Sequence, residues 1–362
     1  MKTKIIKTVQ FIGLGYLEPL IRLLTGEDLK KNGKEAFKRI LFPILSVVLF
    51  IFLWQSFSNY LNNVESEIKI EKALKDQGPE AAKKLEACIA SGDISCLPNS
   101  LPSPSMVYTA IGKLWDDHKI MGAKKQEFID KYEPINVERE AKGQIQIVYT
   151  GRPSFVDQIM TSLKTVFAGF LLSIIIAVPT GIVLGLSTTL RTSFNWIVQI
   201  FKPVSPVVWL LLVSMIVKTL LTNVEVEKSF VISFISVGLC SMWATLVNTS
   251  VGVSSVDKDY INVAKVLQLG TFSKVFKIIL PSSFPMIFTG LRITLSVAWM
   301  VLIAIELLAQ SPGLGSFVWE EFQNGSSDSN SKIIVAMFVI GIIGFMLDRI
   351  MMIFQKLLTF TD

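Results

Sequence analysis

The apolar residues of this chain gather in long runs that polar segments separate. A run of about 20 apolar residues is long enough for an α-helix to cross a hydrocarbon core of about 30 Å. Six such runs predict membrane-spanning helices at residues 41–60, 164–187, 196–220, 229–251, 286–309 and 332–353. The pattern therefore predicts an all-α integral membrane protein with six transmembrane helices.

The polar segments set the rest of the organisation. Within the stretch 8–24, Glu18 and Pro19 interrupt an apolar sequence, which favours a helix along the membrane surface; a loosely ordered leader is the alternative. The segment after the first run is too long for a plain loop and is expected to hold structure of its own. The expected division is an N-terminal segment, a first span, an external segment, a five-helix core and a tail, at 1–40, 41–61, 62–160, 161–355 and 356–362.

Composition supports a membrane protein. Hydrophobic residues make up 51% of the 362 residues, charged residues make up 18%, and the mean hydropathy is +0.53. An average soluble domain has about 25% charged residues. The net charge of +6 does not indicate nucleic-acid binding, because the basic residues flank apolar helices and form no patch interleaved with aromatic residues.

The distribution of basic residues predicts the topology. Residues 1–40 carry nine lysines and arginines, and the segment 252–285, between the fourth and fifth spans, carries four lysines. The positive-inside rule then places both termini and this segment in the cytoplasm. Residues 62–160 are external, since loops longer than about 60 residues are translocated regardless of charge. We expect a multi-pass protein of the cell inner membrane.

The segment 252–285 has the pattern of two short amphipathic helices. Apolar residues recur at helical spacing before Gly270, which permits a sharp turn, and again around Phe276, before Pro281 ends the second helix. Such a pair would present apolar side chains to a groove on a cytoplasmic partner. The alternative is a helix pair that touches only lipid headgroups.

This segment resembles the coupling loop of ABC importer permeases, and the resemblance extends over about residues 160–353. The family pattern is Glu-Ala-Ala, three residues, Gly, nine residues and Ile-x-Leu-Pro. Aligned without a gap, the matching positions here are Asn262, Val263, Ala264, Gln268, Ile278, Leu280 and Pro281. Two residues depart from the pattern: Asn262 replaces the acidic residue, and Gln268 replaces the glycine, which suggests that the turn moves to Gly270.

The sequence is most similar to the nitrate, sulfonate and taurine branch of these permeases. The stretches FKPVSPVVWL, AKVLQL, ILPSSFPMIFTGLR and GLGSFVWEEFQN resemble its nitrate, nitrite, cyanate and bicarbonate members. The resemblance implies the type I ABC importer permease fold and import of a small oxyanion. A sulfonate such as taurine is the alternative cargo, and a standalone channel or carrier is the alternative class.

The resemblance also implies the partners. Two permease subunits would line one path, as a homodimer of this chain or as a pair of related chains. Cytoplasmic ATPase subunits would bind the coupling loops, and an external substrate-binding protein would deliver the cargo. The chain has no G-x-x-x-x-G-K-[ST] loop, so we expect it not to be an enzyme, to bind no cofactor, and to leave ATP and Mg²⁺ to the partner ATPase.

Polar residues within spans are the candidates for the translocation path, because they are costly in lipid. Ser205, Pro206 and Trp209 begin the third span, where broken helix geometry would expose backbone donors to an anion or only make a packing kink. Trp299 and Glu306 lie in the fifth span. Trp299 fits a core position better than the path, and Glu306 fits either a gate or a local pairing.

Other residues have structural interpretations. Arg292 is expected to form an ion pair or orient the helix rather than to serve as an exit site for anions. Gly169, Gly181 and Gly185 are spaced to let helices approach closely. Cys88 and Cys96 could form a disulfide in an oxidising compartment. No catalytic constellation or metal site is predicted.

Overall fold

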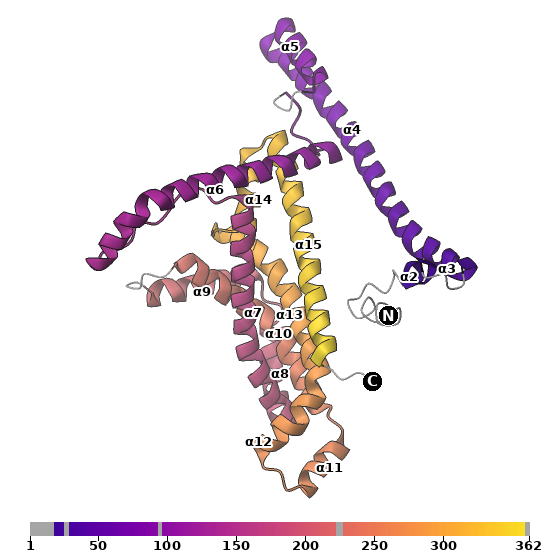
Figure 1. Cartoon of the computed structure of the whole chain (residues 1–362), viewed down its shortest axis with the longest axis vertical. Coiled ribbons are helices and arrows are strands. Elements are labelled where there is room, and N and C mark those ends of the chain that lie inside the picture. Colours follow the sequence, from indigo (N-terminus) through magenta and orange to yellow (C-terminus); the bar gives the residue numbers. More distant parts are fainter. Residues whose placement is uncertain (1–17, 25–28, 93–95, 222–226, 359–362) are drawn as a thin grey trace. The chain divides into compact units, whose positions relative to one another are not determined.

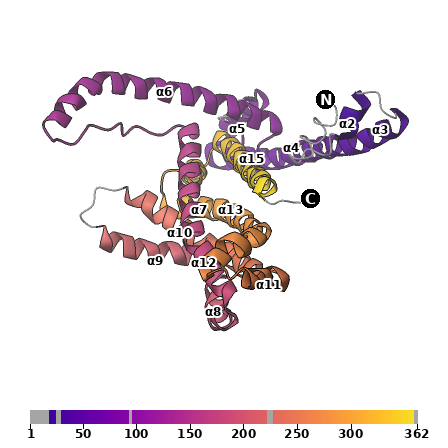
Figure 2. The same ribbon diagram turned by 60° about the horizontal axis from the view of Figure 1, so that its bottom comes forward.

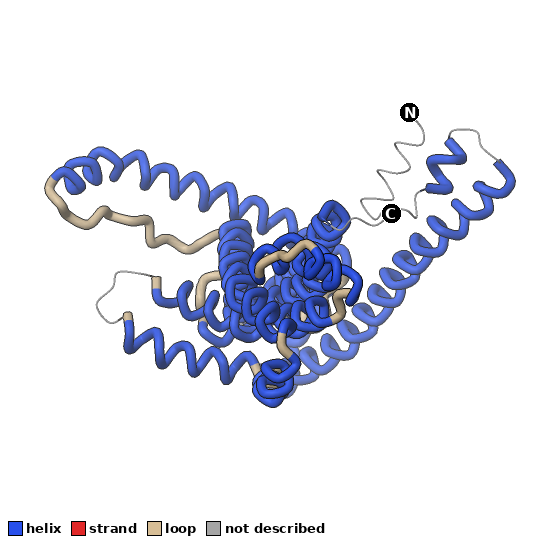
Figure 3. The backbone as a smooth tube through the Cα atoms, turned by 90° about the horizontal axis from the view of Figure 1, so that it is seen from below, coloured by secondary structure: helices blue, strands red, loops and turns tan. Residues whose placement is uncertain are grey.

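The computed structural model describes residues 18–24, 29–92, 96–221 and 227–358. Within these residues every regular element is a helix, as the blue tube in Figure 3 shows. The all-α prediction is therefore confirmed. Most of the expected surface helix at 8–24 lies outside the described residues, which include only its last seven residues as α2.

The described helices follow one another along the whole chain (Figure 1). In chain order they are α2 (Glu18–Leu24), α3 (Leu29–Ala36), the π-helical turn η2 (Phe37–Leu41), α4 (Phe42–Gln77), α5 (Pro79–Ala90), α6 (Pro104–Ala141), α7 (Phe155–Leu186), α8 (Thr188–Phe201), α9 (Pro206–Leu220), α10 (Lys228–Ser254), α11 (Lys258–Val266), α12 (Thr271–Lys274), the π-helical turn η3 (Val275–Ile279), α13 (Leu280–Ala309), α14 (Leu314–Asn324) and α15 (Ser327–Leu358).

Five helical stretches among the described residues are long and apolar enough to cross a membrane, and a bent pair brings the number to six. The straight stretches contain α4, α7, α10, α13 and α15, which correspond to five of the six predicted spans. Each is longer than its apolar run. Helix α4, for example, continues to Gln77, well beyond the predicted end of the first span at residue 61.

The third predicted span, 196–220, is not one straight helix. Helices α8 and α9 meet at an angle of 99°, and in Figures 1 and 2 they leave the break in different directions. Ser205 precedes a proline, which disfavours helical geometry, and its ψ of 140° is extended. Pro206 then starts α9, where a missing N–H costs nothing. The break falls at Pro206, where the sequence predicted broken helix geometry.

The chain divides into two compact units, the first formed by residues 1–46, 162–311 and 341–362 and the second by 47–161 and 312–340. In the first unit, glycines bring α7 and α10 into close contact. A Cβ atom at Gly169, Gly181 or Gly185 would lie 2.8 Å, 2.6 Å or 2.5 Å from a side-chain atom of α10. The close approach predicted from these three glycines is confirmed.

Hydroxyl groups complete the packing of this unit. Ser173 of α7 donates a hydrogen bond to the Gly238 carbonyl of α10 at 2.9 Å. Thr245 of α10 and Thr294 of α13 are joined at 2.7 Å. Small residues and buried hydroxyls are what hold helices together in lipid, where apolar burial gives no driving force. Helices α7, α10 and α13 thus form the core of the first unit.

The second unit contains the whole of the segment 62–160, which the sequence predicted to be external. That segment has structure of its own, as expected, because it includes α5 and the whole of the 38-residue α6. A disulfide joins Cys88 and Cys96, with their Cα atoms 5.9 Å apart. Lys113 of α6 forms an ion pair with Asp328 at the start of α15, at 2.6 Å. The disulfide that the sequence left open is therefore present in the structure.

The close contact of α7 and α10 predicts a strong effect of a single methyl group. Gly181→Ala would place its Cβ 2.6 Å from the Thr249 Cβ and 2.9 Å from a backbone oxygen, so we expect a loss of about 1–3 kcal/mol of stability. The measurement is the Tm of the detergent-solubilised protein. Gly341→Ala is the matched control, because its Cβ would meet nothing within 4 Å. Equal Tm values for the two variants would contradict this packing.

Candidate functional site

The segment between α10 and α13 folds as two short helices joined by a turn (Figure 1). Asp257 caps α11, since its carboxylate accepts a hydrogen bond from the Asp259 N–H at 3.0 Å. The N–H groups of Gln268 and Leu269 bond to carbonyls of α11 at 3.0 Å, which ends that helix. The helix pair expected from the sequence is present.

The turn does not move to Gly270, as the sequence had suggested. Gln268 has a φ of +48°, the left-handed conformation that favours glycine. Gly270 has a φ of −62° and a ψ of 161°, an ordinary extended conformation, and precedes α12. The turn therefore stays at the position of the family glycine, and a glutamine adopts it because local hydrogen bonds hold the backbone there.

Pro281 also differs from the prediction, because it does not end the second helix. Helix α12 continues through η3 into α13, and Pro281 is the second residue of α13. A proline within a helix removes a hydrogen bond and clashes with the preceding turn. The wider π-helical turn Val275–Ile279 directly precedes α13, so the helix departs from regular α-geometry next to the proline.

Apolar side chains of this segment are exposed. The exposed fraction is 81% for Val266, 82% for Phe272 and 64% for Phe276. Ala264, by contrast, is 1% exposed, and α11 contacts η3. The segment therefore keeps a fixed shape while it presents large apolar groups. We call the exposed set Val263, Val266, Leu267, Phe272 and Phe276 the coupling surface.

The other motif residues of this segment differ in exposure. Asn262, Gln268, Gly270 and Pro281 are exposed. Ile278 and Leu280 are half-buried. Asn262 carries no charge, so any ion pair that an acidic residue would make at this position is absent from the chain's chemistry. The surface is dominated by apolar groups with lysines beside them.

The three candidate residues at the α8–α9 break have structural roles. The Ser205 hydroxyl caps α9 by accepting from the Val207 N–H at 3.4 Å. Trp209 packs against the cluster around Trp243, and its ring lies 5.9 Å from that of Phe201. Its buried indole N–H has no hydrogen-bond partner among the described residues. Together with Pro206, these residues fix the bend.

Trp299 and Glu306 of α13 are buried within the first unit. Trp299 lies against Gly344 of α15, where an added Cβ would be 3.1 Å from its ring. Glu306 is 1% exposed, and both of its carboxylate oxygens lie 2.8 Å from the Ser162 hydroxyl, which donates to them. Neither side chain lies on an open surface of this chain.

The ion pair expected at Arg292 is present and lies beside a groove. Arg292 of α13 donates to the Asp348 carboxylate of α15 through Nε at 2.5 Å and Nη2 at 2.8 Å. The expectation of an ion pair at Arg292 is confirmed. The groove has a volume of about 460 Å³ and is lined by Thr289, Arg292, Ile293, Ser296, Val297, Met300, Asp348 and Gln355. The signal in the sequence was two opposite charges within apolar runs.

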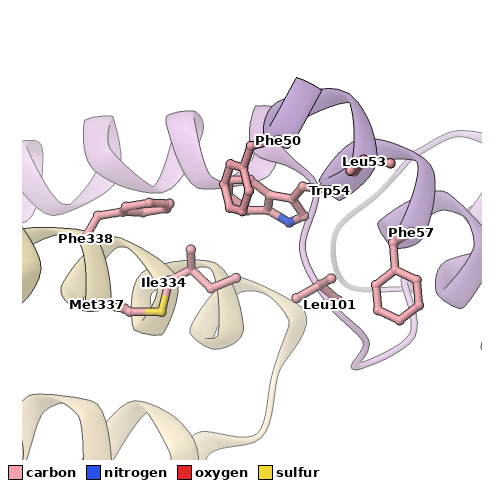
Figure 4. A pocket seen from close by; sticks show the side chains of 8 residues that line it. All are labelled: Phe50, Leu53, Trp54, Phe57, Leu101, Ile334, Met337 and Phe338. Atoms are coloured by element: carbon pink, nitrogen blue, oxygen red, sulfur yellow. The ribbon is translucent and has the colours of Figure 1, made fainter. Parts of the chain in front are cut away.

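A second groove, in the second unit, has a similar volume of about 470 Å³ but a different chemistry. Figure 4 shows aromatic and aliphatic side chains around it, among them Trp54 and Phe338, whose rings are 5.8 Å apart. The Trp54 indole N–H already donates to the Pro102 carbonyl at 3.0 Å. This groove therefore offers an anion no free donor, unlike the groove beside Arg292.

Comparisons with known proteins agree with this architecture. Residues 169–360 match the family model described as "Binding-protein-dependent transport system inner membrane component". The nitrate import permease protein NrtB of Synechococcus elongatus is 35% identical over 193 residues, which are 53% of this chain and 66% of that protein. The bicarbonate transport system permease protein CmpB of Synechocystis sp. is 35% identical over 202 residues, 56% of this chain and 68% of that protein.

The aligned region thus spans about two thirds of the length of these relatives. An inward-facing structure of the MetNI methionine ABC transporter aligns with 57% of this chain at 14% identity and a TM-score of 0.48, too weakly to support an argument. The family match confirms the resemblance seen in the sequence, and with it a permease rather than an enzyme. Since the family model covers more than half of the chain, this protein belongs to the binding-protein-dependent transport system inner membrane components, the permease subunits of ABC importers.

Proposed function

We propose that this chain forms the path by which an ATP-driven importer carries a small planar oxyanion of the nitrate or bicarbonate class into the cell. The observation that carries the proposal is the coupling surface, which presents exposed aromatic and aliphatic groups on a rigid helix pair between two membrane helices. Apolar groups in such a pair fit a groove on a partner protein. The relatives named as nitrate and bicarbonate permeases support the class of cargo.

The assembly follows from this role. Cytoplasmic ATPase subunits bind the coupling surface and carry the ATP and Mg²⁺, an external binding protein delivers the anion, and a second permease subunit, in our proposal an identical copy, completes the path. Closure of the ATPases would move α11 and α12, and with them α13, because α12 continues into α13 without a break in the helix. Pro281 does not interrupt the helical connection between α12 and α13.

The coupling surface predicts loss of the ATPase on one substitution. Phe276→Asp should weaken its binding about 30-fold or more, because an apolar anchor in an interface contributes about 2 kcal/mol or more. The measurement is the amount of ATPase that copurifies with the tagged permease in mild detergent. Phe276→Leu is the control, since it keeps an apolar side chain at the same place. Undiminished copurification with Phe276→Asp, in a variant with wild-type Tm, would contradict the docking role.

The proposed topology makes the disulfide external. In intact cells, a reductant and a maleimide that do not cross the membrane should together label Cys88 and Cys96, because both lie in the segment assigned to the outside. Without the reductant neither should react. Labelling that requires permeabilised cells would reverse the orientation and place the coupling surface on the wrong side for an ATPase.

The proposed cargo predicts a ranking of uptake. Cells with the complete importer should accumulate labelled nitrate or bicarbonate in preference to taurine, and Phe276→Asp should abolish the uptake of all three. Preference for taurine would replace the oxyanion with a sulfonate and leave the importer proposal intact. Uptake that survives Phe276→Asp would favour a channel or carrier that needs no ATPase.

A further inference from the structure

The groove beside Arg292 has features that an ion pair between helices does not require. Arg292 lies within a stretch long and apolar enough to span the membrane, and its side chain is 39% exposed. Ionised groups in such a stretch face protein or water, because lipid cannot solvate them. The neighbouring turns of α13 place Thr289 and Ser296 on the same groove. A charged, hydroxyl-bearing face of a membrane helix is therefore left open in a single chain.

The geometry of the pair leaves one edge of the guanidinium free. Asp348 occupies the Nε and Nη2 edge. Among the described residues, no hydrogen bond to Nη1 is formed, so the Nη1 and Nη2 edge has donors to spare. A guanidinium edge binds two oxygens of a planar oxyanion through two parallel N–H bonds. The groove can also hold waters, each with a share of about 30 Å³ of liquid volume.

We propose that the free edge of Arg292 is a transit site for the transported oxyanion, with Asp348 as the competing carboxylate that keeps its binding weak. This inference rests on the proposed function. A site on a conduction path must release its ion as readily as it binds it. Asp348 serves that requirement, because it takes half of the guanidinium and repels an incoming anion. The hydroxyls of Thr289 and Ser296 bond to backbone carbonyls at 2.8 Å and 3.1 Å, and they can rotate toward a ligand.

The test is protection of a cysteine in the groove. In a Cys240→Ala background, Ser296→Cys should be the only reactive thiol among the described residues, since Cys88 and Cys96 are bonded. Inside-out vesicles holding the assembled importer are treated with a neutral, water-soluble methanethiosulfonate. We expect nitrate to slow the labelling at least fivefold relative to chloride at equal ionic strength. A thiol that does not react would overturn the proposal, because the face would then be covered.

Three further variants distinguish a transit site from a purely structural pair. Arg292→Gln should abolish the protection, whereas Arg349→Gln, which removes a neighbouring charge that lies over the Phe345 ring, should keep it. Asp348→Asn should lower the nitrate concentration needed for protection at least fivefold, an effect that a purely structural pair would not give. Equal protection in all variants would overturn the site.

The same vesicles distinguish this failure from that of the proposed function. If the wild-type importer moves nitrate or bicarbonate with ATP but neither anion protects Ser296→Cys, only the transit-site proposal is contradicted. If neither anion is transported, both the proposed cargo and the transit site for these oxyanions are contradicted.

Discussion

The close approach of α7, α10 and α13 is the constraint on which the first unit depends. Lipid gives apolar side chains no reason to prefer a neighbouring helix, so the helices need backbone contact and buried hydrogen bonds to stay together. Glycines at 181 and 185 allow that contact on one side of α10, and Gly290 allows it on the other. The serine and threonine hydroxyls then bond across the interfaces at distances of 2.7–3.0 Å.

One end of this helix packing fixes the coupling surface. Helix α10 ends at Ser254 and α13 begins at Leu280, and their contact holds both ends of the intervening segment. Buried Ala264 and Ile279 keep the short helices against the unit, while Phe272 and Phe276 remain outside. A stiff connection of this kind transmits the position of a bound partner to α13, which carries Arg292 and its groove.

Much of this arrangement could be predicted from the spacing of apolar residues and glycines along the sequence. The apolar runs predicted the spanning helices, and the glycine spacing predicted the α7–α10 contact. The prolines predicted a break in the third span, but its angle of 99° was not predictable, because hydropathy continues across Pro203 and Pro206. The pairing of Glu306 with Ser162 depends on which face α13 turns toward α7, which hydropathy along the chain does not encode. The pairing of Arg292 with Asp348 joins residues 56 positions apart and required coordinates.

The turn at Gln268 bears on how such loops are recognised. What the position demands is a backbone angle, and a left-handed residue other than glycine costs roughly 1–2 kcal/mol. The chain tolerates that cost because carbonyls of α11 accept hydrogen bonds from the N–H groups of the turn. A sequence-motif search that requires glycine at this position therefore rejects a loop that has the required backbone geometry. A structural search on φ and ψ angles would accept this loop. The same search would find other family members that lack the glycine but keep the left-handed turn.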